Sequence, residues 1–346
     1  LQDNAEAFLG EVEGRSAGSL RRYASTAEAQ VEEALRALGY YSPMIQWEVV
    51  EQPGDDETPA RLVLTVQPGE PIRVRSRQVS IEGPASRDPD FVGTLPEKPS
   101  EGDVLNHGQY STLRQTIQNR APRLGDFDGE FTTRRLEVNP EQHTADISLV
   151  FRSGVRYRLG EVSFKEGHGF EEQLLEQFVR FEPGEIYHAD KVARLSGDLS
   201  NSGYFSGVDI DASPGKAEEG VIPVSVDLTT RPPRSVAAGV GFSTDVGPRF
   251  SGNWREHWIN PMGHRRGAQT ELSVPRQNVG AWYELPLDPP MTDSIRLSAG
   301  YQREDIEDVE SELLTLGQQW KHQLDNGWLQ VASIRWEGER FRIGDD

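Results

Sequence analysis

The chain has 346 residues, and its 56 acidic against 36 basic side chains give a formal net charge of −20. This charge repels phosphates, and no basic patch is interleaved with aromatic residues, so we expect no nucleic-acid partner. Only 35% of the residues are hydrophobic and no run approaches about 18 apolar residues, which excludes a membrane-spanning helix. Composition does not exclude a β-barrel, because apolar residues that face lipid alternate with polar ones along each strand and do not raise the average.

The sequence also bears on compartment and completeness. Cysteine is absent, which excludes disulfides and thiol-based metal or redox sites and suits a periplasmic or outer-membrane protein. The chain opens on Leu1 rather than on methionine, and no signal segment follows, so we expect a mature or trimmed fragment.

The first predicted elements form one α+β unit. Apolar residues spaced at i, i+3, i+4 and i+7 predict an amphipathic helix over Thr26–Leu38, and Gly39 ends it in the left-handed conformation. Two strands follow, at Met44–Glu51 and Arg61–Val66. Only a short helix, Ala5–Val12, precedes the long helix, so the unit lacks an opening strand, which we expect to have been removed or never present.

The same order of elements recurs with a fixed period. Gly39 and Gly203 lie 164 positions apart, which is twice 82, and Val79–Gly83 is echoed by Val162–Gly167 after 83 residues. Such a period predicts repeated modules, each reading strand, helix, helix, strand, strand. The predicted modules are residues 1–74 (truncated at its start), 75–157 and 158–233.

From residue 234 onward the composition changes, and an antiparallel meander is predicted. In Ala268–Val274 the less polar and polar residues alternate, as in a strand with one apolar and one wet face. Six of the seven tryptophans lie beyond this boundary; they form an interfacial aromatic girdle or fill the core of a soluble sheet, and long strands favour the girdle. The predicted strands are Ser235–Phe242, Arg249–Trp258, Ala268–Val274, Val279–Pro286, Ser294–Arg303, Leu313–Leu324 and Trp328–Phe341.

Two turn-rich segments carry a resemblance to a known family. Gly241–Arg249, followed by Trp258–His264, resembles the start of the barrel in TamA-type outer-membrane proteins, which carry periplasmic POTRA modules and belong to the translocation and assembly module. The order of elements in each repeat is also that of a POTRA module. The resemblance implies α+β POTRA modules followed by the first part of an antiparallel transmembrane β-barrel, residues 234–346, here about seven of sixteen strands.

No catalytic, cofactor or metal site is predicted. A Gly-x-Ser-x-Gly elbow, a His-Glu-x-x-His motif and a Walker loop are absent. His257 and His264 bracket a turn without a third ligand, so plain turn histidines are favoured. The acidic segment Asp305–Glu312 lacks the glycine and spacing of a calcium loop and is predicted to be a solvated loop. His264–Arg266 fits either contact with lipid phosphates or a plain solvated turn.

The predicted functional element is the first barrel strand. Its small residues pack poorly and pair weakly at its edge, and in the family this strand meets the last one at a seam that can part, exposing backbone to an incoming strand. Relief of crowding inside the barrel explains the small residues equally well. The strand comprises Ser235, Val236, Ala237, Ala238, Gly239, Val240, Gly241 and Phe242.

Two further segments are predicted to matter. Arg231, Pro232 and Pro233 would form a stiff joint between the third module and the barrel, because consecutive prolines restrict the backbone. An edge strand of the third module offers a docking edge for a partner. Its residues are Val208, Asp209, Ile210, Asp211 and Ala212.

The resemblance implies a non-enzymatic function at the outer membrane of a Gram-negative bacterium. The protein would help insert or secrete autotransporters and other β-barrel substrates, work with a TamB-like protein anchored in the inner membrane, touch outer-membrane lipids and take part in phospholipid transport. A two-partner secretion transporter, a central barrel-assembly subunit and a soluble periplasmic scaffold remain as alternatives.

Overall fold

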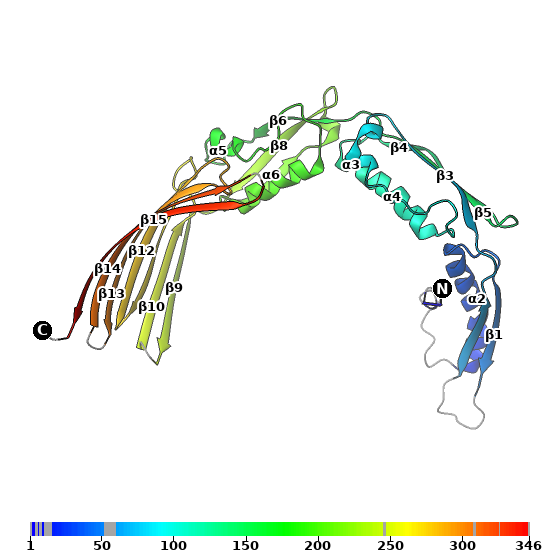
Figure 1. The fold of residues 1–346 in the computed structure, drawn as a ribbon, viewed down its shortest axis with the longest axis horizontal. Coiled ribbons are helices and arrows are strands. Elements are labelled where there is room, and N and C mark those ends of the chain that lie inside the picture. The colour runs from blue at the N-terminus through cyan, green and yellow to red at the C-terminus, as the bar shows by residue number, and fades with distance from the viewer. Residues whose placement is uncertain are drawn as a thin grey trace. The chain divides into compact units, whose positions relative to one another are not determined.

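The computed structural model describes residues 2–3, 6, 9, 16–51, 60–244, 247–306, 309–324 and 326–344. The chain divides into two compact units, Leu1–Tyr157 and Arg158–Asp346 (Figure 1). Among the helices described, none is long and apolar enough to cross a membrane.

The first unit begins with a helix packed on a two-stranded sheet. Helix α2 (Ala17–Ala37) starts nine residues before the predicted Thr26, because the Ser16 hydroxyl accepts a hydrogen bond from the Ser19 amide at 3.4 Å and caps the helix. Leu20 and Ala24 extend its buried stripe toward this cap. Strands β1 (Met44–Val50) and β2 (Arg61–Gln67) pair antiparallel.

The rest of the first unit has the predicted order of strand, helix, helix, strand, strand. In its sheet β5 lies in the centre, parallel to β3 and antiparallel to β4. The helices cover one face, and apolar residues from both layers form the core. The elements are β3 (Arg73–Glu82), η1 (Pro84–Arg87), α3 (Pro89–Val92), α4 (His107–Arg123), β4 (Glu130–Asn139) and β5 (Thr144–Arg152).

The second unit opens with the same arrangement, as the repeat predicts. Strand β8 is central, parallel to β6 and antiparallel to β7, so β7 lies at an edge. The α+β order predicted for these modules is therefore confirmed, while the boundaries drawn between them stay predictions. The elements are β6 (Arg158–Phe164), α5 (Glu172–Glu176), α6 (Ala189–Asn201), β7 (Phe205–Asp211), η2 (Pro214–Lys216) and β8 (Val221–Thr230).

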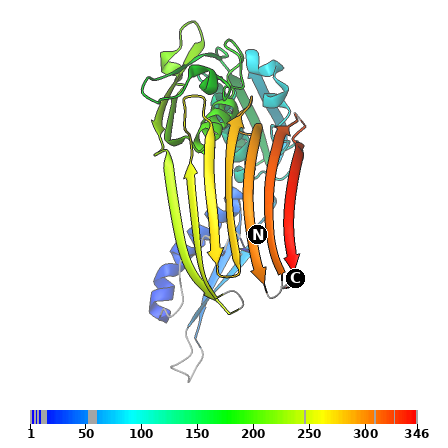
Figure 2. The same cartoon turned by 90° about the vertical axis from the view of Figure 1, so that its left-hand side faces the viewer.

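A seven-stranded antiparallel meander completes the second unit (Figure 2). Each strand pairs with its neighbour in sequence, and β9 and β15 lie at the two edges. The strands are β9 (Arg234–Ser243), β10 (Gly247–Glu256), β11 (Arg265–Ser273), β12 (Arg276–Pro286), β13 (Ser294–Ile306), β14 (Val309–Gln323) and β15 (Leu329–Ile343).

Several predicted strand ends differ from the structure by two to four residues, and two of the differences have a local cause. Strand β10 ends at Glu256, so Trp258 lies in the following turn, because its indole and the neighbouring His257 amide bond to the segment before β9. The acidic segment predicted to be a solvated loop is largely strand: Asp305 belongs to β13 and Glu310 to β14, and the two pair directly. Residues 307 and 308 lie outside the described part.

Candidate functional site

Strand β9 is the edge of the seven-stranded sheet. Within the described residues it pairs with β10 alone, so the backbone groups of its other side have no strand partner there. The predicted first strand, Ser235–Phe242, lies entirely inside it. Two of its valines are strongly exposed, Val236 at 76% and Val240 at 89%. The strand therefore offers both an unpaired edge and an uncovered apolar face.

The glycines of β9 differ in what surrounds them. A Cβ added at Gly239 would lie 2.8 Å from the Ser251 hydroxyl, whereas one at Gly241 would find its nearest neighbour, Arg249 Nε, at 4.0 Å. Relief of crowding thus accounts for Gly239 but not for Gly241. Substitutions at these two glycines can therefore distinguish weak pairing at the edge from relief of crowding, the two explanations that the sequence left open.

One face of the sheet is apolar from edge to edge; we call it the apolar face. Directly paired residues of antiparallel strands share a face, so each row of pairs across β9–β15 lies on one side. Uncovered apolar rows of this kind are typical of the lipid-facing side of a membrane sheet. One row is Val236, Trp254, Ala268, Ala281, Ala299, Leu316 and Trp336, and the next is Ala238, Gly252, Thr270, Val279, Tyr301, Leu314 and Gly338.

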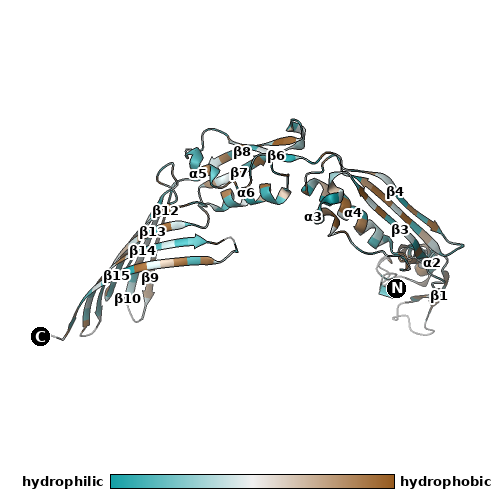
Figure 3. Cartoon of the chain, turned by 45° about the horizontal axis from the view of Figure 1, so that its top comes forward, coloured by the Kyte–Doolittle hydropathy of each residue, from teal (hydrophilic) through white to brown (hydrophobic). Residues whose placement is uncertain are grey.

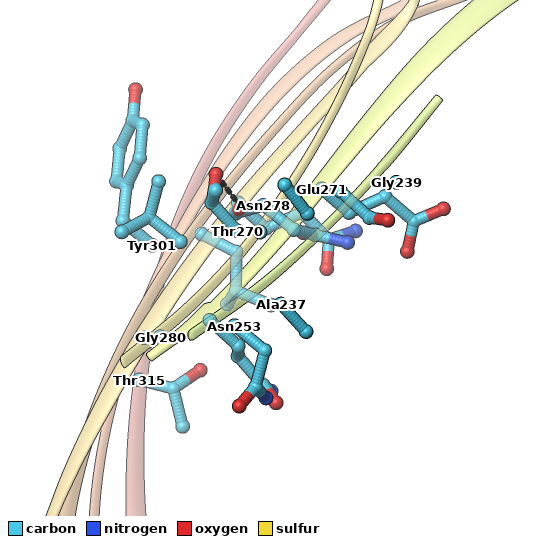
Figure 4. A pocket seen from close by; sticks show the side chains of 17 residues that line it. Ala237, Gly239, Asn253, Thr270, Glu271, Asn278, Gly280, Tyr301 and Thr315 are labelled. Carbon is cyan, nitrogen blue, oxygen red and sulfur yellow. Dashed lines mark hydrogen bonds between the residues drawn. The ribbon is translucent and has the colours of Figure 1, made fainter. Parts of the chain in front are cut away.

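The opposite face is polar and hollowed. Residues such as Asn253, Glu271, Asn278 and Gln302 lie in its rows, around a hollow of about 620 Å³ (Figure 4). Apolar and polar residues alternate along the strands in Figure 3, as two faces of different character require. This polar face is suited to water or polar chain segments and not to lipid.

The tryptophans divide between these surroundings. Trp254, Trp320 and Trp336 lie on the apolar face, where an interfacial girdle needs them. Trp282 pairs with Gly267 and Ser298 on the polar face, and Trp258 lies in the β10–β11 turn. The predicted girdle is therefore too broad, since a strand residue's face depends on its register and not on its residue type.

The β10–β11 turn docks onto the third module through an aromatic cluster. The Phe170 ring lies 5.3 Å from the Trp258 ring and 5.1 Å from the Tyr204 ring, centre to centre. Tyr204 is fully buried. Rings at these distances and tilts attract each other beyond the area they bury. We call this contact between module and sheet the joint.

Polar contacts complete the joint. The Tyr204 hydroxyl donates to the Gly263 carbonyl at 2.7 Å, and Arg265 Nη2 donates to the Ser202 carbonyl at 2.5 Å. The Arg265 guanidinium also lies 4.4 Å from the centre of the Tyr204 ring, a cation–π geometry. The Glu171 amide donates to the Pro261 carbonyl at 3.0 Å. These bonds hold the first module-side turn of the sheet to the module.

Burial changes the acidity of the central phenol. It raises the pKa of Tyr204 above its ordinary value, and the positive charge of Arg265 opposes this only in part. The hydroxyl therefore remains protonated at neutral pH and keeps donating to Gly263.

The predicted stiff segment Arg231–Pro233 lies beside the joint and is braced there. The Arg231 amide donates to the Tyr204 carbonyl at 2.8 Å, and the Arg231 carbonyl accepts from the Trp258 indole at 3.2 Å. The Pro233 carbonyl accepts from the His257 amide at 2.8 Å. The bonds named here use the backbone of the segment, and its role as a stiff linker stays a prediction.

The predicted docking edge, Val208–Ala212, falls on β7 and the residue after it. Strand β7 ends at Asp211, so Ala212 lies outside the strand. Lys216 Nζ and the Ser213 hydroxyl both bond Asp211, and these bonds lower the pKa of its carboxyl to about 2. This end of the edge is thus tied to its own loop, and docking of a partner along β7 remains untested.

The two histidines that the sequence singled out have separate surroundings. His264 Nδ1 lies 2.8 Å from the Tyr283 hydroxyl, and burial together with nearby arginines lowers the pKa of His257. Neither the two histidines nor other His, Asp or Glu residues of the described part form a group of three or more placed to hold a metal.

A second cluster of charges lies at the end of the first unit. Arg156 bonds Asp126 through Nε at 3.0 Å and Nη2 at 2.6 Å, and Asp88 through Nη1 at 2.5 Å. Burial raises the pKa of Asp126 despite these bonds, whereas for Asp88 the bonds outweigh burial and the pKa falls. The cluster fixes the segment that leaves the last strand of this unit, since Asp126 is itself buried.

The contacts of Phe170, Gly263 and Arg265 in the joint were not predicted from the sequence. For His264–Arg266 the sequence left either contact with lipid phosphates or a plain solvated turn, whereas Arg265 bonds the Ser202 carbonyl of the module. A weak signal existed in the repeat, where an aromatic pair follows the helix-ending glycine at both Gly39 and Gly203. In the first unit Tyr41, two residues after Gly39, places its hydroxyl 2.7 Å from His107 Nε2. An aromatic residue after this glycine thus reaches the next part of the chain in both units.

Comparison with known proteins agrees with this architecture. Residues 1–68 match the family model described as POTRA domain TamA domain 1, and residues 157–231 match the model described as POTRA, surface antigen variable number repeat. The outer membrane protein assembly factor BamA of Nitratidesulfovibrio vulgaris is 23% identical over 190 residues, which cover 53% of this chain and 24% of that protein. The chain therefore spans about a quarter of this relative's length.

One solved structure shares the fold. BamA from Haemophilus ducreyi lacking POTRA domains 1–3 superposes with a TM-score of 0.62 at 15% identity, over 78% of this chain and 51% of that one. CdiB from Escherichia coli reaches a TM-score of 0.47 at 14% identity, over 97% of this chain and 62% of that one. The chain thus consists of POTRA modules followed by an antiparallel sheet like that of an outer-membrane barrel. It is an outer-membrane protein whose N-terminal modules lie in the periplasm.

Proposed function

We propose that this chain belongs to a factor that helps insert or secrete autotransporters and other β-barrel substrates at the outer membrane. The observation that carries the proposal is β9: an edge strand with small residues, an unpaired side within the described part, and a module-side end that follows the braced segment Arg231–Pro233. An incoming strand adds to such an edge through main-chain hydrogen bonds, which need no particular side chains.

The small residues of β9 favour exchange of its partner. Glycine and alanine give few cross-strand side-chain contacts, so each pair they form adds little stability. Gly241 has room for a side chain that the sequence does not supply. A strand that pairs weakly releases its product, while the joint keeps the strand in place between substrates.

The modules are proposed to work with a TamB-like protein anchored in the inner membrane. Support comes from the TamA-type match of residues 1–68 and from the edge strands that the modules offer, β7 among them. Substrates and partner would then approach from the periplasm, toward the module-side end of β9. No step in this scheme needs a bound nucleotide or a catalytic residue.

The other assignments fit less well. A central barrel-assembly subunit is favoured by the BamA similarity, but the TamA-type match of the first module supports the TamA-like assignment over it. A two-partner secretion transporter is expected to have two modules, whereas the repeat predicts three. A soluble periplasmic scaffold would have to cover the apolar face, whose valines, leucines and tryptophans are exposed.

Site-specific photocrosslinking in cells tests the proposal. A photoreactive residue is placed in turn at Val236, Ala238 and Val240 of the full-length protein, with Val279 as the matched control. Val279 lies on the same face and in the same row as Ala238 but in the middle of the sheet. Adducts to barrel precursors at β9 and not at Val279 support the proposal. Adducts to the protein's own last strand and to lipid alone would refute it.

Movement of phospholipid between the membranes is a second candidate function. The exposed apolar face and the arginines at its module-side end favour it, because they meet acyl chains and phosphates. The same crosslinking experiment bears on this function: adducts to lipid without precursors at β9 would shift the assignment toward it.

A further inference from the structure

The apolar face has one groove at its module-side end. Three alanines that pair directly across β11, β12 and β13 form its floor, and larger side chains rise beside them. The groove holds about 350 Å³ and is open toward the surroundings of the sheet. Its floor is Ala268, Ala281 and Ala299, and its walls are Trp254, Tyr283 and Leu297.

Two arginines stand at the module-side end of this groove. Arg266 lines the groove itself, and its guanidinium lies 5.3 Å from the centre of the Trp254 ring. Arg266 Nε bonds Glu256 Oε2 at 2.5 Å, and Arg234 Nε bonds Glu256 Oε1 at 2.6 Å. Strands β9, β10 and β11 bring the three residues into one row of the apolar face.

The charges in this row do not balance. One buried carboxylate, that of Glu256, faces two guanidinium groups whose side chains stay 71% and 48% exposed. One positive charge is left over at the membrane surface. Each guanidinium carries five N–H donors in a planar fork and uses only part of them on Glu256, so the others are free to bind a planar or tetrahedral anion.

The position of the charge selects the anion. Strand β9 leaves the third module at Arg234, so the arginines lie at the periplasmic end of the sheet, where the apolar rows begin. A ligand that fits both the excess positive charge and the apolar groove needs a phosphate at the membrane surface and a hydrocarbon chain directed toward the middle of the sheet. Neighbouring rows of one face are two residues apart along a strand, which is about 7 Å. The alanine row is the next row after the arginines, so an acyl chain reaches it directly below the phosphate.

We infer that this groove binds a glycerophospholipid of the periplasmic leaflet, with its phosphate on Arg234 and Arg266 and one acyl chain over Ala268, Ala281 and Ala299. Glu256 positions the two arginines and keeps them apart. The inference rests on the membrane placement of the sheet and not on the proposed cargo. Loss of lipid binding with intact substrate insertion, or the reverse, would separate the two.

Photolabelling with a defined lipid tests the inference. The full-length protein is reconstituted in nanodiscs that contain phosphatidylethanolamine with a diazirine in its acyl chain, and adducts are mapped by mass spectrometry. We expect labelling at residues 281–283 to exceed labelling at Leu316, which lies in the row of Ala281 outside the groove. Replacing both arginines, R234A with R266A, should lower this ratio about tenfold, because each charged hydrogen bond to phosphate is lost.

Matched variants keep the result specific. Ala281→Trp fills the floor and should lower the ratio, whereas Ala332→Trp on β15 of the same face should not. Arg303→Ala, at the far end of the apolar face, should leave it unchanged. A ratio that survives loss of both arginines overturns the inference. So does equal labelling by a diacylglycerol that carries the same diazirine but no phosphate, since the face would then hold only unspecific lipid.

Discussion

Replacing Gly263 by alanine should open the joint between the third module and the sheet. Gly263 has a φ of 74°, a conformation that side chains other than glycine's rarely adopt. An added Cβ would lie 2.7 Å from both the Tyr204 hydroxyl and Leu174 Cδ2. The alanine methyl and the buried phenol cannot both keep their places, so the hydrogen bond from Tyr204 to the Gly263 carbonyl is lost.

The size of the effect follows from two contributions. Backbone strain at a left-handed residue costs about 1 kcal/mol for alanine relative to glycine. Overpacking against a buried tyrosine and leucine adds about 2 kcal/mol. Together they lower the free energy of opening the joint by about 3 kcal/mol, which corresponds to about a hundredfold increase in the open population.

Hydrogen–deuterium exchange of the detergent-solubilised protein measures this opening directly. Peptides that contain the Glu171 and His257 amides, both bonded across the joint, should exchange about a hundredfold faster in the G263A variant. Gly184→Ala is the matched control, because Gly184 lies in the same module with a φ of 87° and has no atom within 4 Å of an added Cβ.

Two results would refute this reasoning. Unchanged exchange at the joint in the G263A variant would mean that Tyr204 and Leu174 do not hold the turn. Equal acceleration in the Gly184 control would mean that backbone strain anywhere in the module, and not the contact with Tyr204, opens the joint.

Three further predictions concern other contacts. Replacing Arg156 by methionine strands the buried Asp126 carboxylate and should destabilise the first unit by about 4 kcal/mol, seen as a lower denaturation midpoint. The raised pKa of Tyr204 stabilises the fold below the ordinary tyrosine pKa, and this contribution is lost as pH rises through the folded pKa; a tyrosinate absorption titration of Tyr204→Phe should lack this late step. If weak pairing of β9 is needed for function, Gly241→Ala should lower the yield of crosslinked substrate adducts severalfold. If the glycines only relieve crowding, Gly241→Ala should leave that yield unchanged, and only Gly239→Ala should destabilise the sheet.

The repeat made much of the fold predictable. Local periodicity and the helix-ending glycines at 39 and 203 gave the order of elements, because both depend on residues close in sequence. The period then supplied the middle module without a strong motif of its own. The meander was predictable for the same reason: alternation and short turns are local features.

The joint could not be predicted in this way. It brings Phe170 and Tyr204 against a turn more than fifty residues further along the chain, and no local pattern encodes that meeting. The end of β10 was mispredicted for the same reason. The strand stops where its next residues bond the segment before β9 instead of a neighbouring strand. The acidic segment near residue 305 continues as strand because β14 pairs with β13 as far as Ile306. Charge alone indicated a loop.

The rows of the apolar face also determine how the sheet leans. On β9 apolar residues begin at Val236 and continue to Phe242, whereas on β15 they run from Ala332 to Trp336 and give way to Arg340. The first apolar row on β15 therefore lies two rows nearer the module side than the first apolar row on β9. This displacement is about 14 Å along the strands, and the two strands are about 29 Å apart across the sheet. If the apolar band lies parallel to the bilayer, the strands are therefore inclined by about 25° to the bilayer normal.

The third module lies close to the apolar rows of the sheet. Only the row of Arg234 separates the joint from the first apolar row on β9. The module therefore lies next to the lipid headgroup layer, and no free stretch of chain separates the module from the membrane part of the sheet. Under the function proposed above, a polypeptide passed from the module to β9 would enter the bilayer without crossing open periplasm.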